Sequence, residues 1–174
     1  MKDKYPLISR YAKWMPDNAL ASMKLHNSDA LSLLFDKGSL TASLIHLSKN
    51  NFDVNVLSQK IAVPYWHEQK KLKKPLSQAA IIREVELHLH GKAVVFARTI
   101  IPLSVKGGRL RNLGKTPLGH LLFKDGRIRV SKREFCMASI KETTIVGRRT
   151  PYEYQGETIL VSEHFLPSLN SYLS

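Results

Sequence analysis

The stretch from 80 to 101, AIIREVELHLHGKAVVFARTII, constrains the fold more than any other part of the sequence. Apolar and polar residues alternate through its first half, which is the pattern of a β-strand with one buried face. Gly91 lies between this half and a second apolar run, and glycine at such a bend is typical of a hairpin. The sequence therefore predicts two antiparallel strands joined at 90–92.

Further strands and a few helices are predicted around this hairpin. Apolar residues at helical spacing predict a helix through 31–35, with a cap at 27–29 and an end at Gly38. The remaining predictions are β-like stretches at 41–47 and 55–66, an exposed lysine-rich connection at 67–77, and strands at 127–130, 133–140 and 157–165. Because the strands lack helical crossovers, the pattern favours an α+β fold with one antiparallel sheet and helices on one face.

The size and composition of the chain are those of one globular domain. We expect a single domain over 1–174, with 43% hydrophobic and 24% charged residues arguing against disorder. No apolar run approaches the roughly 18 residues of a membrane span, and the N-terminus lacks a signal-peptide core. The single cysteine, Cys136, excludes an internal disulfide and is interpreted as a packing residue. These features predict a cytoplasmic protein.

The chain is strongly basic, with 27 Lys and Arg against 14 Asp and Glu and a net charge of +13. Such an excess attracts anions of every kind, nucleic acids included. The basic residues form short groups at 70–74, 109–115, 124–133 and 147–149 instead of one tract. That distribution suits a solvated face or a small anionic substrate equally well. We find no zinc-finger, helix-turn-helix or basic-zipper pattern, so a nucleic-acid partner is not expected.

Two charged residues are predicted to point into the core. Strand alternation places Arg83 on the face of Ile81 and Val85, and Glu163 on the face of Val161. An unpaired buried charge costs several kcal/mol by rough estimate, so each must pair or face a polar ligand. One interpretation is a buried structural ion pair. The other is a dry pocket in which the guanidinium binds a carboxylate and the carboxylate accepts a hydroxyl hydrogen bond.

Other candidate residues carry weaker signals. Arg98 lies in a strand with apolar residues on both sides, which favours a structural role. His88 and His90 fall on the outward face, where surface residues are commoner than metal ligands. The segment 114–116 resembles the end of a phosphate-binding loop, but Pro117 argues against the helix that such a loop opens. The sequence also lacks the nucleophile elbow of serine hydrolases and the His-Glu-x-x-His motif.

Five motifs give the chain a resemblance to the chorismate lyase family. They are IIREVEL at 81–87, ARTIIP at 97–102, LGKTPLG at 113–119, VGRR at 146–149 and SEHFLP at 162–167, in the family's order and approximate spacing. The resemblance implies that Arg83 binds a ring carboxylate and that Glu163 binds the hydroxyl end of the ligand. It further implies a ligand contact from the backbone of Leu118 and an apolar contact from Leu31 in a helical flap.

The resemblance also implies a fold and a reaction. The fold is an antiparallel sheet with helices on one side and helical flaps over an enclosed ligand pocket. The reaction eliminates pyruvate from chorismate and leaves 4-hydroxybenzoate, the aromatic precursor of ubiquinone or related products. Aromatisation of the ring drives it, and no metal or organic cofactor is implied. The partners are then substrate and product alone, with a monomeric enzyme.

Two alternatives to the enzyme stay open at this stage. Ligand-sensing domains of some bacterial transcription regulators resemble the same fold and bind small anions without turning them over. Against that interpretation, this sequence has no attached DNA-binding domain and has about the length of the enzyme alone. A basic nucleic-acid-binding module is the third class and rests only on the net charge.

Overall fold

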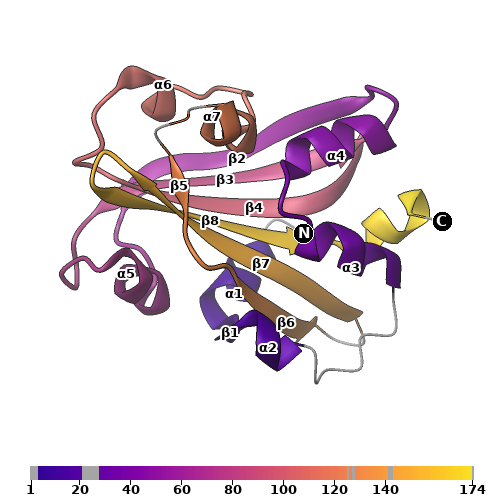
Figure 1. Ribbon diagram of the computed structural model, residues 1–174, viewed down its shortest axis with the longest axis horizontal. Coiled ribbons are helices and arrows are strands. Elements are labelled where there is room, and N and C mark those ends of the chain that lie inside the picture. Colours follow the sequence, from indigo (N-terminus) through magenta and orange to yellow (C-terminus); the bar gives the residue numbers. More distant parts are fainter. Residues whose placement is uncertain (1–3, 21–27, 125, 127, 141–142, 174) are drawn as a thin grey trace.

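The computed structural model describes residues 4–20, 28–124, 126, 128–140 and 143–173. Within these residues eight strands form one antiparallel sheet in the order β1-β6-β7-β8-β4-β3-β2, with β5 paired to β7 (Figure 1). The strands are β1 Trp14–Met15, β2 Phe52–Ala62, β3 Ala80–Leu89, β4 Lys92–Pro102, β5 Arg129–Val130, β6 Glu134–Ile140, β7 Thr143–Tyr154 and β8 Glu157–Phe165. The predicted α+β class with an antiparallel sheet is confirmed.

Short helices connect and cover the strands. They are α1 Lys4–Tyr11, α2 Asp17–Leu20, α3 Ser28–Phe35, α4 Leu40–Leu47, α5 Trp66–Leu72, α6 Gly108–Arg111, α7 Leu118–Lys124 and the 3-10 helix η1 Pro167–Tyr172. No helix in the described part of the chain is both long and apolar enough to cross a membrane.

The predicted hairpin at 80–101 is the centre of the sheet. β3 and β4 pair in antiparallel register and are joined by His90 and Gly91, which have φ values of 47° and 76°. A two-residue hairpin turn of this kind needs positive φ at both positions. β3 alternates between buried and half-buried residues, whereas β4 is buried on both sides. The sheet therefore needs cover on both of its faces.

The helices are divided between the two faces. Leu33 and Leu34 of α3 and Leu44 of α4 pack with Val85 of β3 in one core cluster, on the face that α6 and α7 also cover. On the opposite face Ile8 of α1 packs with Phe96, and Figure 1 shows α1 behind the sheet. The prediction that helices cover one face is thus right for most of the helices, while α1 and α5 cover the other face.

Two segments differ from their predicted structure. Residues 41–47, predicted as β-like, belong to α4, because Ser39 caps the helix through the amide of Ala42 and Leu40 and Leu44 bury one side. The lysine-rich connection predicted at 67–77 overlaps α5, in which Glu68 and Leu72 are buried while Lys70 is exposed. In both segments tertiary burial outweighs the local signal.

Cys136 is buried in β6, as its interpretation as a packing residue predicts. Burial raises the pKa of its thiol to about 12, so the reactive thiolate does not form at neutral pH. Its Sγ lies 3.9 Å from Nδ1 of the fully buried His164. Neighbouring Gly147 leaves room for this ring, because a Cβ there would come within 2.8 Å of the same nitrogen.

A buried ion pair joins α5 to the sheet on the α1 side. Arg98 of β4 donates from Nε and Nη2 to the two oxygens of Glu68, at 2.8 and 3.0 Å, and from Nη1 to Glu84 at 2.6 Å. The ring of Tyr65 lies 4.2 Å from the Arg98 guanidinium carbon. The predicted structural role of Arg98 is confirmed, and the pair sets the position of α5 on β4.

We expect the Glu68→Ala variant to lose about 3 kcal/mol of unfolding free energy, because removing one partner leaves much of the buried Arg98 charge uncompensated. Urea denaturation followed by circular dichroism measures the loss. Asp53→Ala is the matched control, since Asp53 and Lys115 form an exposed pair at 3.4 Å that should contribute little. Equal losses in the two variants would contradict the role assigned to the buried pair.

Candidate functional site

Arg83 and Glu163 lie on the same face of the sheet, on strands separated by β4. The register pairs Arg83 with Thr99 and Thr99 with Val161, while Glu163 lies two residues further along β8, opposite Ala97. From strand spacing and rise, their Cα atoms are about 12 Å apart. The short side chains of Thr99, Ala97 and Val161 lie between them and are buried. Each side chain lies on the face that alternation predicts within its own strand, and the register shows that the two strands present these side chains on the same face of the sheet.

Arg83 is a buried cation whose partners are neutral. Nη1 donates to Oε1 of Gln59 at 3.2 Å, and Nη2 donates to the carbonyl of Gly114 at 2.8 Å. Among the described residues no carboxylate lies within ion-pair distance, and burial lowers the pKa of the guanidinium. A guanidinium has five N–H donors, so donors remain for a ligand. Arg83 is therefore equipped to bind an anion.

Glu163 pairs with a residue other than Arg83. Its Oε2 accepts a hydrogen bond from Nε of Arg148 at 2.6 Å, across neighbouring positions of β7 and β8. The interpretation of Arg83 and Glu163 as partners in one structural ion pair is therefore wrong. Oε1 of Glu163 has no hydrogen-bond partner within the described residues, and the side chain is 15% exposed. One carboxylate oxygen is thus left to accept a ligand hydrogen.

Arg148 is the residue of this site that sequence reasoning missed. Its Nη1 donates to the carbonyls of Leu33 at 2.9 Å and Asp36 at 2.8 Å, at the C-terminal end of α3. The last carbonyls of a helix lack intrahelical partners, and a cation there is favourable. Arg148 therefore connects Glu163 directly to the end of α3. The VGRR motif contained the signal, but alternation alone does not separate Arg148 from Arg149.

Leu118 begins α7, and its turn is attached to Arg83. Within the turn the amide of Thr116 donates to the carbonyl of Leu113 at 2.8 Å, while the carbonyl of Gly114 accepts from Arg83. The buried side chain of Leu118 belongs to the same apolar cluster as Val161. The structure thus brings the turn of Leu118 to the Arg83 end of the site.

Leu31 belongs to α3, but its side chain lies outside the described part of the chain. What the structure describes is the helix itself. Leu33 and Leu34 of α3 are buried in the core cluster that includes Val85 and Ala97. The end of α3 also contacts Arg148, and Arg148 in turn binds Glu163. The helix predicted as a flap therefore lies over the Glu163 end of the site.

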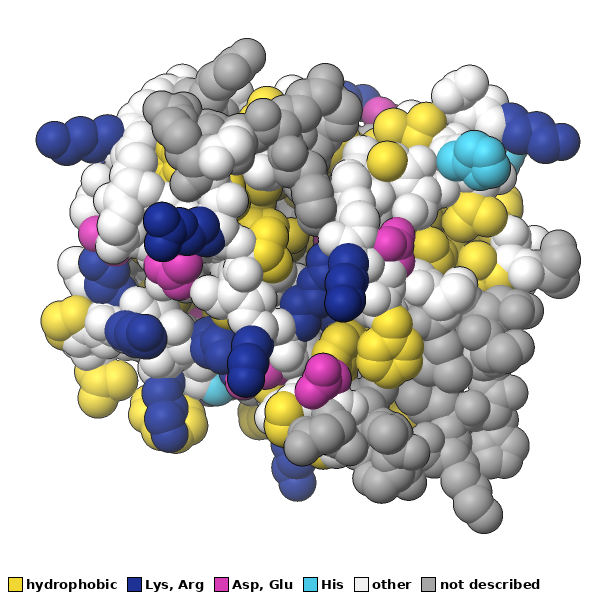
Figure 2. Space-filling model, in the orientation of Figure 1, with side chains coloured by type: hydrophobic (Ala, Val, Ile, Leu, Met, Phe, Trp, Pro, Cys, Tyr) yellow, Lys and Arg dark blue, Asp and Glu magenta, His cyan; other side chains and the backbone are white. Residues whose placement is uncertain are grey.

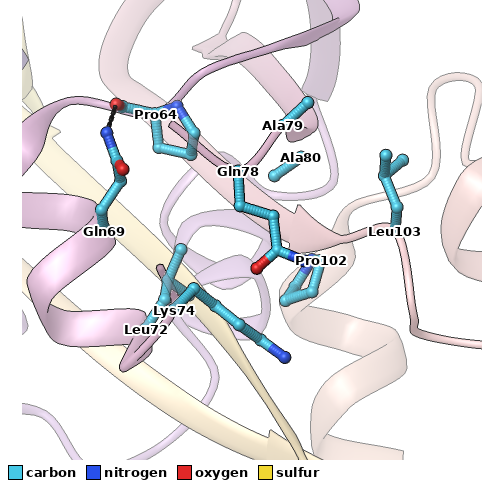
Figure 3. Close-up of a pocket in the computed structure, with 9 residues that line it drawn as sticks. All are labelled: Pro64, Gln69, Leu72, Lys74, Gln78, Ala79, Ala80, Pro102 and Leu103. Carbon is cyan, nitrogen blue, oxygen red and sulfur yellow. Dashed lines mark hydrogen bonds between the residues drawn. The ribbon is translucent and has the colours of Figure 1, made fainter. Parts of the chain in front are cut away.

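The opposite side of the sheet has a small pocket between α5 and the ends of β3 and β4, shown in Figure 3. Gln69 closes one end of it by donating to the carbonyl of Pro64 at 2.7 Å. Its volume of about 10 Å³ holds about one water molecule and excludes a substituted ring. Across the described residues no group of three His, Cys, Asp or Glu side chains could hold a metal ion.

Solved structures define the class of fold. A GntR-family transcriptional regulator from Bacillus cereus is similar with a TM-score of 0.54 and 8% identity, over 68% of this chain and 93% of that chain. The ligand-binding domain of a putative GntR-family regulator from Bordetella bronchiseptica is similar with a TM-score of 0.53 and 12% identity, over 67% of this chain and 86% of that chain. At such identities the likeness shows a shared fold alone, the chorismate lyase-like α+β fold.

The sequence gives the family. The chorismate lyase family profile matches residues 8–172. The probable chorismate pyruvate-lyase of Methylococcus capsulatus is 34% identical over 155 residues, 80% of this chain and 96% of that protein. The probable chorismate pyruvate-lyase of Pseudomonas putida is 38% identical over 146 residues, which cover 78% of this chain and 80% of that protein. The probable chorismate pyruvate-lyase of Pseudomonas aeruginosa is 33% identical over 168 residues, which cover 91% of this chain and 93% of that protein. The chain belongs to the chorismate lyase family.

In the Arg148→Met variant we expect backbone amides in the last turn of α3 to exchange hydrogen about tenfold faster, because the terminal carbonyls lose a charged donor. Hydrogen exchange followed by mass spectrometry measures the change. Arg111→Met is the control, since Nη2 of Arg111 likewise donates to two backbone carbonyls, of Leu103 and Val105. Unchanged exchange in α3 of the Arg148→Met variant would refute the connection.

Proposed function

We propose that the protein is a chorismate pyruvate-lyase, a single-domain enzyme that converts chorismate into 4-hydroxybenzoate and pyruvate. One observation carries the proposal. Within a chain of the chorismate lyase family, the buried cation Arg83 lacks an anionic partner in the described structure, and Glu163 on the same sheet face has a free oxygen. A buried charge without a counter-charge is costly unless a ligand supplies one.

The two ends of the site match the two ends of the substrate ring. Chorismate has a ring carboxylate and, across the ring, a hydroxyl group. In our proposal the free N–H groups of Arg83 bind the carboxylate and Oε1 of Glu163 accepts the hydroxyl hydrogen bond. The backbone of Leu118 and the apolar side chain of Leu31 complete the contacts. Thr99, Ala97 and Val161 form a floor of short side chains on which a flat ring can lie.

The reaction follows from this placement. The bond between the ring carbon and the ether oxygen breaks, and the carbon that bears the hydroxyl group loses its proton. The electron pair of that C–H bond completes the aromatic ring, while the departing enolpyruvate takes up a proton and becomes pyruvate. Glu163 lies at the hydroxyl end and is the side chain placed to accept the ring proton. The protein then supplies orientation, desolvation and electrostatic stabilisation.

Two further features belong to the proposal. We infer that the enzyme acts as a monomer in the cytoplasm, and that its product serves as the aromatic precursor for ubiquinone or related compounds. The alternative function is a sensing domain that binds small anions without turnover, and it is favoured only by the fold shared with GntR-family regulators. The two functions differ in whether pyruvate is released.

A coupled pyruvate assay on chorismate tests the proposal. We expect the wild type to release pyruvate, and Arg83→Ala and Glu163→Gln each to lower kcat/KM by about a hundredfold, the usual loss when a group that stabilises the transition state is removed. Lys115→Ala removes an exposed charge near the site and should leave activity unchanged.

The outcomes separate the alternatives. Tight binding of 4-hydroxybenzoate by a wild type that releases no pyruvate would identify a sensing domain. If Arg83→Ala and Glu163→Gln both released pyruvate at the wild-type rate, the lyase function would stand and the assignment of these two residues to the site would be wrong.

A further inference from the structure

Chorismate has a second carboxylate, on the enolpyruvyl side chain next to the hydroxyl group, and the proposed site leaves it without a partner. This inference rests on the proposed function. The cation sought must lie on the face of Glu163 and have no carboxylate of its own. Arg148 is paired with Glu163, Arg149 with Glu134, and Arg98 lies on the opposite face with Glu68.

Arg133 meets both conditions. It immediately precedes β6, and alternation places it on the same face as Phe135. Phe135 pairs with Arg148 across β6 and β7, and Arg148 pairs with Glu163 across β7 and β8, so Arg133 lies on the face of Glu163. Extending that register by one residue puts Arg133 beside Thr150, in the cross-strand row that continues through Val161 and Thr99 to Arg83. The two arginines thus occupy opposite ends of one row across the sheet.

The contacts of Arg133 leave much of its guanidinium free. Nη1 donates to the carbonyl of Asp36, and Nη2 donates to that of Lys37 at 3.3 Å. In the described part of the chain no carboxylate lies within ion-pair distance of it. Burial, and then the nearby Arg148, lower its pKa, while Tyr152 and Glu163 act in the opposite direction. Arg133 is a half-buried cation close to Glu163 that lacks an anion.

Arg133 also lines a groove that opens to solvent. The groove has a volume of about 770 Å³ and lies between the end of α3 and the residues leading into β6. Lys37 and Lys132 are exposed cations of its lining, and Figure 2 shows Lys and Arg side chains gathered in the middle of this face. Of its two acidic residues, Glu134 is paired with Lys71 and Arg149, and Asp17 is the other. We call this cavity the basic groove.

We propose that Arg133 binds the enolpyruvyl carboxylate of chorismate, with the enolpyruvyl side chain directed into the basic groove. Arg83 and Arg133 then hold the two carboxylates of the dianion, while Glu163 lies at the hydroxyl group between them. When the ether bond breaks, the electron pair of that bond stays on the enolpyruvate oxygen. Arg133 keeps its hold on the carboxylate of the departing group, which leaves through the groove after taking up a proton.

This assignment makes Arg133 selective for substrate over product. The product 4-hydroxybenzoate retains the ring carboxylate and the hydroxyl group but has lost the side chain. Removal of the Arg133 side chain should therefore weaken the binding of chorismate alone, whereas removal of the Arg83 side chain should weaken the binding of both molecules. A residue that only supports the link between α3 and α4 would affect both molecules equally.

The test compares the two molecules in Arg133→Met and Arg83→Met. For Arg133→Met we expect the KM for chorismate to rise about tenfold to a hundredfold, as loss of a charge-assisted hydrogen bond implies, and the Kd for 4-hydroxybenzoate to change less than about twofold. Arg133→Lys keeps the charge and should recover part of the loss. Arg129→Met, on exposed β5 outside the lining of the groove, removes the same charge and should behave like wild type.

Equal losses for chorismate and 4-hydroxybenzoate in Arg133→Met would overturn the inference, as would the same rise in KM in Arg129→Met. If Arg133→Met does not fold, Arg133→Gln, which keeps a side-chain N–H donor but not the charge, gives the same comparison. If the wild type turns chorismate over and Arg133→Met has an unchanged KM, the role of Arg133 is refuted while the lyase proposal stands. A wild type that releases no pyruvate defeats the lyase proposal, and calorimetric Kd values for chorismate then test Arg133 directly.

Discussion

The buried guanidinium of Arg83 is the constraint on which the rest of the site depends. Its neutral partners, Gln59 and the carbonyl of Gly114, solvate the charge without neutralising it. Such a cation is tolerable in a core when an incoming anion completes it. Hydrogen bonds to β2 and to the turn before α7 hold this group in place.

The two faces of the sheet handle charge in opposite ways. On the α5 side Arg98 is fully matched by Glu68 and Glu84, and the result is a structural joint. On the α3 side Arg148 is matched by Glu163, whereas Arg83 has only neutral partners among the described residues, and this is where we propose the site. The same fold carries GntR-family regulators at 8–12% identity, so the architecture itself specifies no reaction.

Strand alternation predicts that Arg83 and Glu163 each lie on the inward face of their own strand, because Arg83 is in step with Val85 and Glu163 with Val161. It could not predict the partner of Glu163, since Arg148 and its neighbour Arg149 look alike in sequence and β7 lacks a clean apolar pattern. Segment 41–47 was misassigned because Thr41 and Ile45 favour strands locally, while the buried Leu40 and Leu44 decide for a helix. The alternation within each strand thus predicts which charged side chains point inward, whereas the ion pair between Glu163 and Arg148 is known only from the structure.

The contact between Arg148 and the end of α3 has a thermodynamic consequence. Because one guanidinium binds both the α3 carbonyls and Glu163, the position of the helix and the orientation of the carboxylate belong to a single equilibrium. In the proposed assignment, a ligand that binds Glu163 acts on the same hydrogen-bond network that holds the end of α3, so ligand binding and the position of this helix are thermodynamically linked.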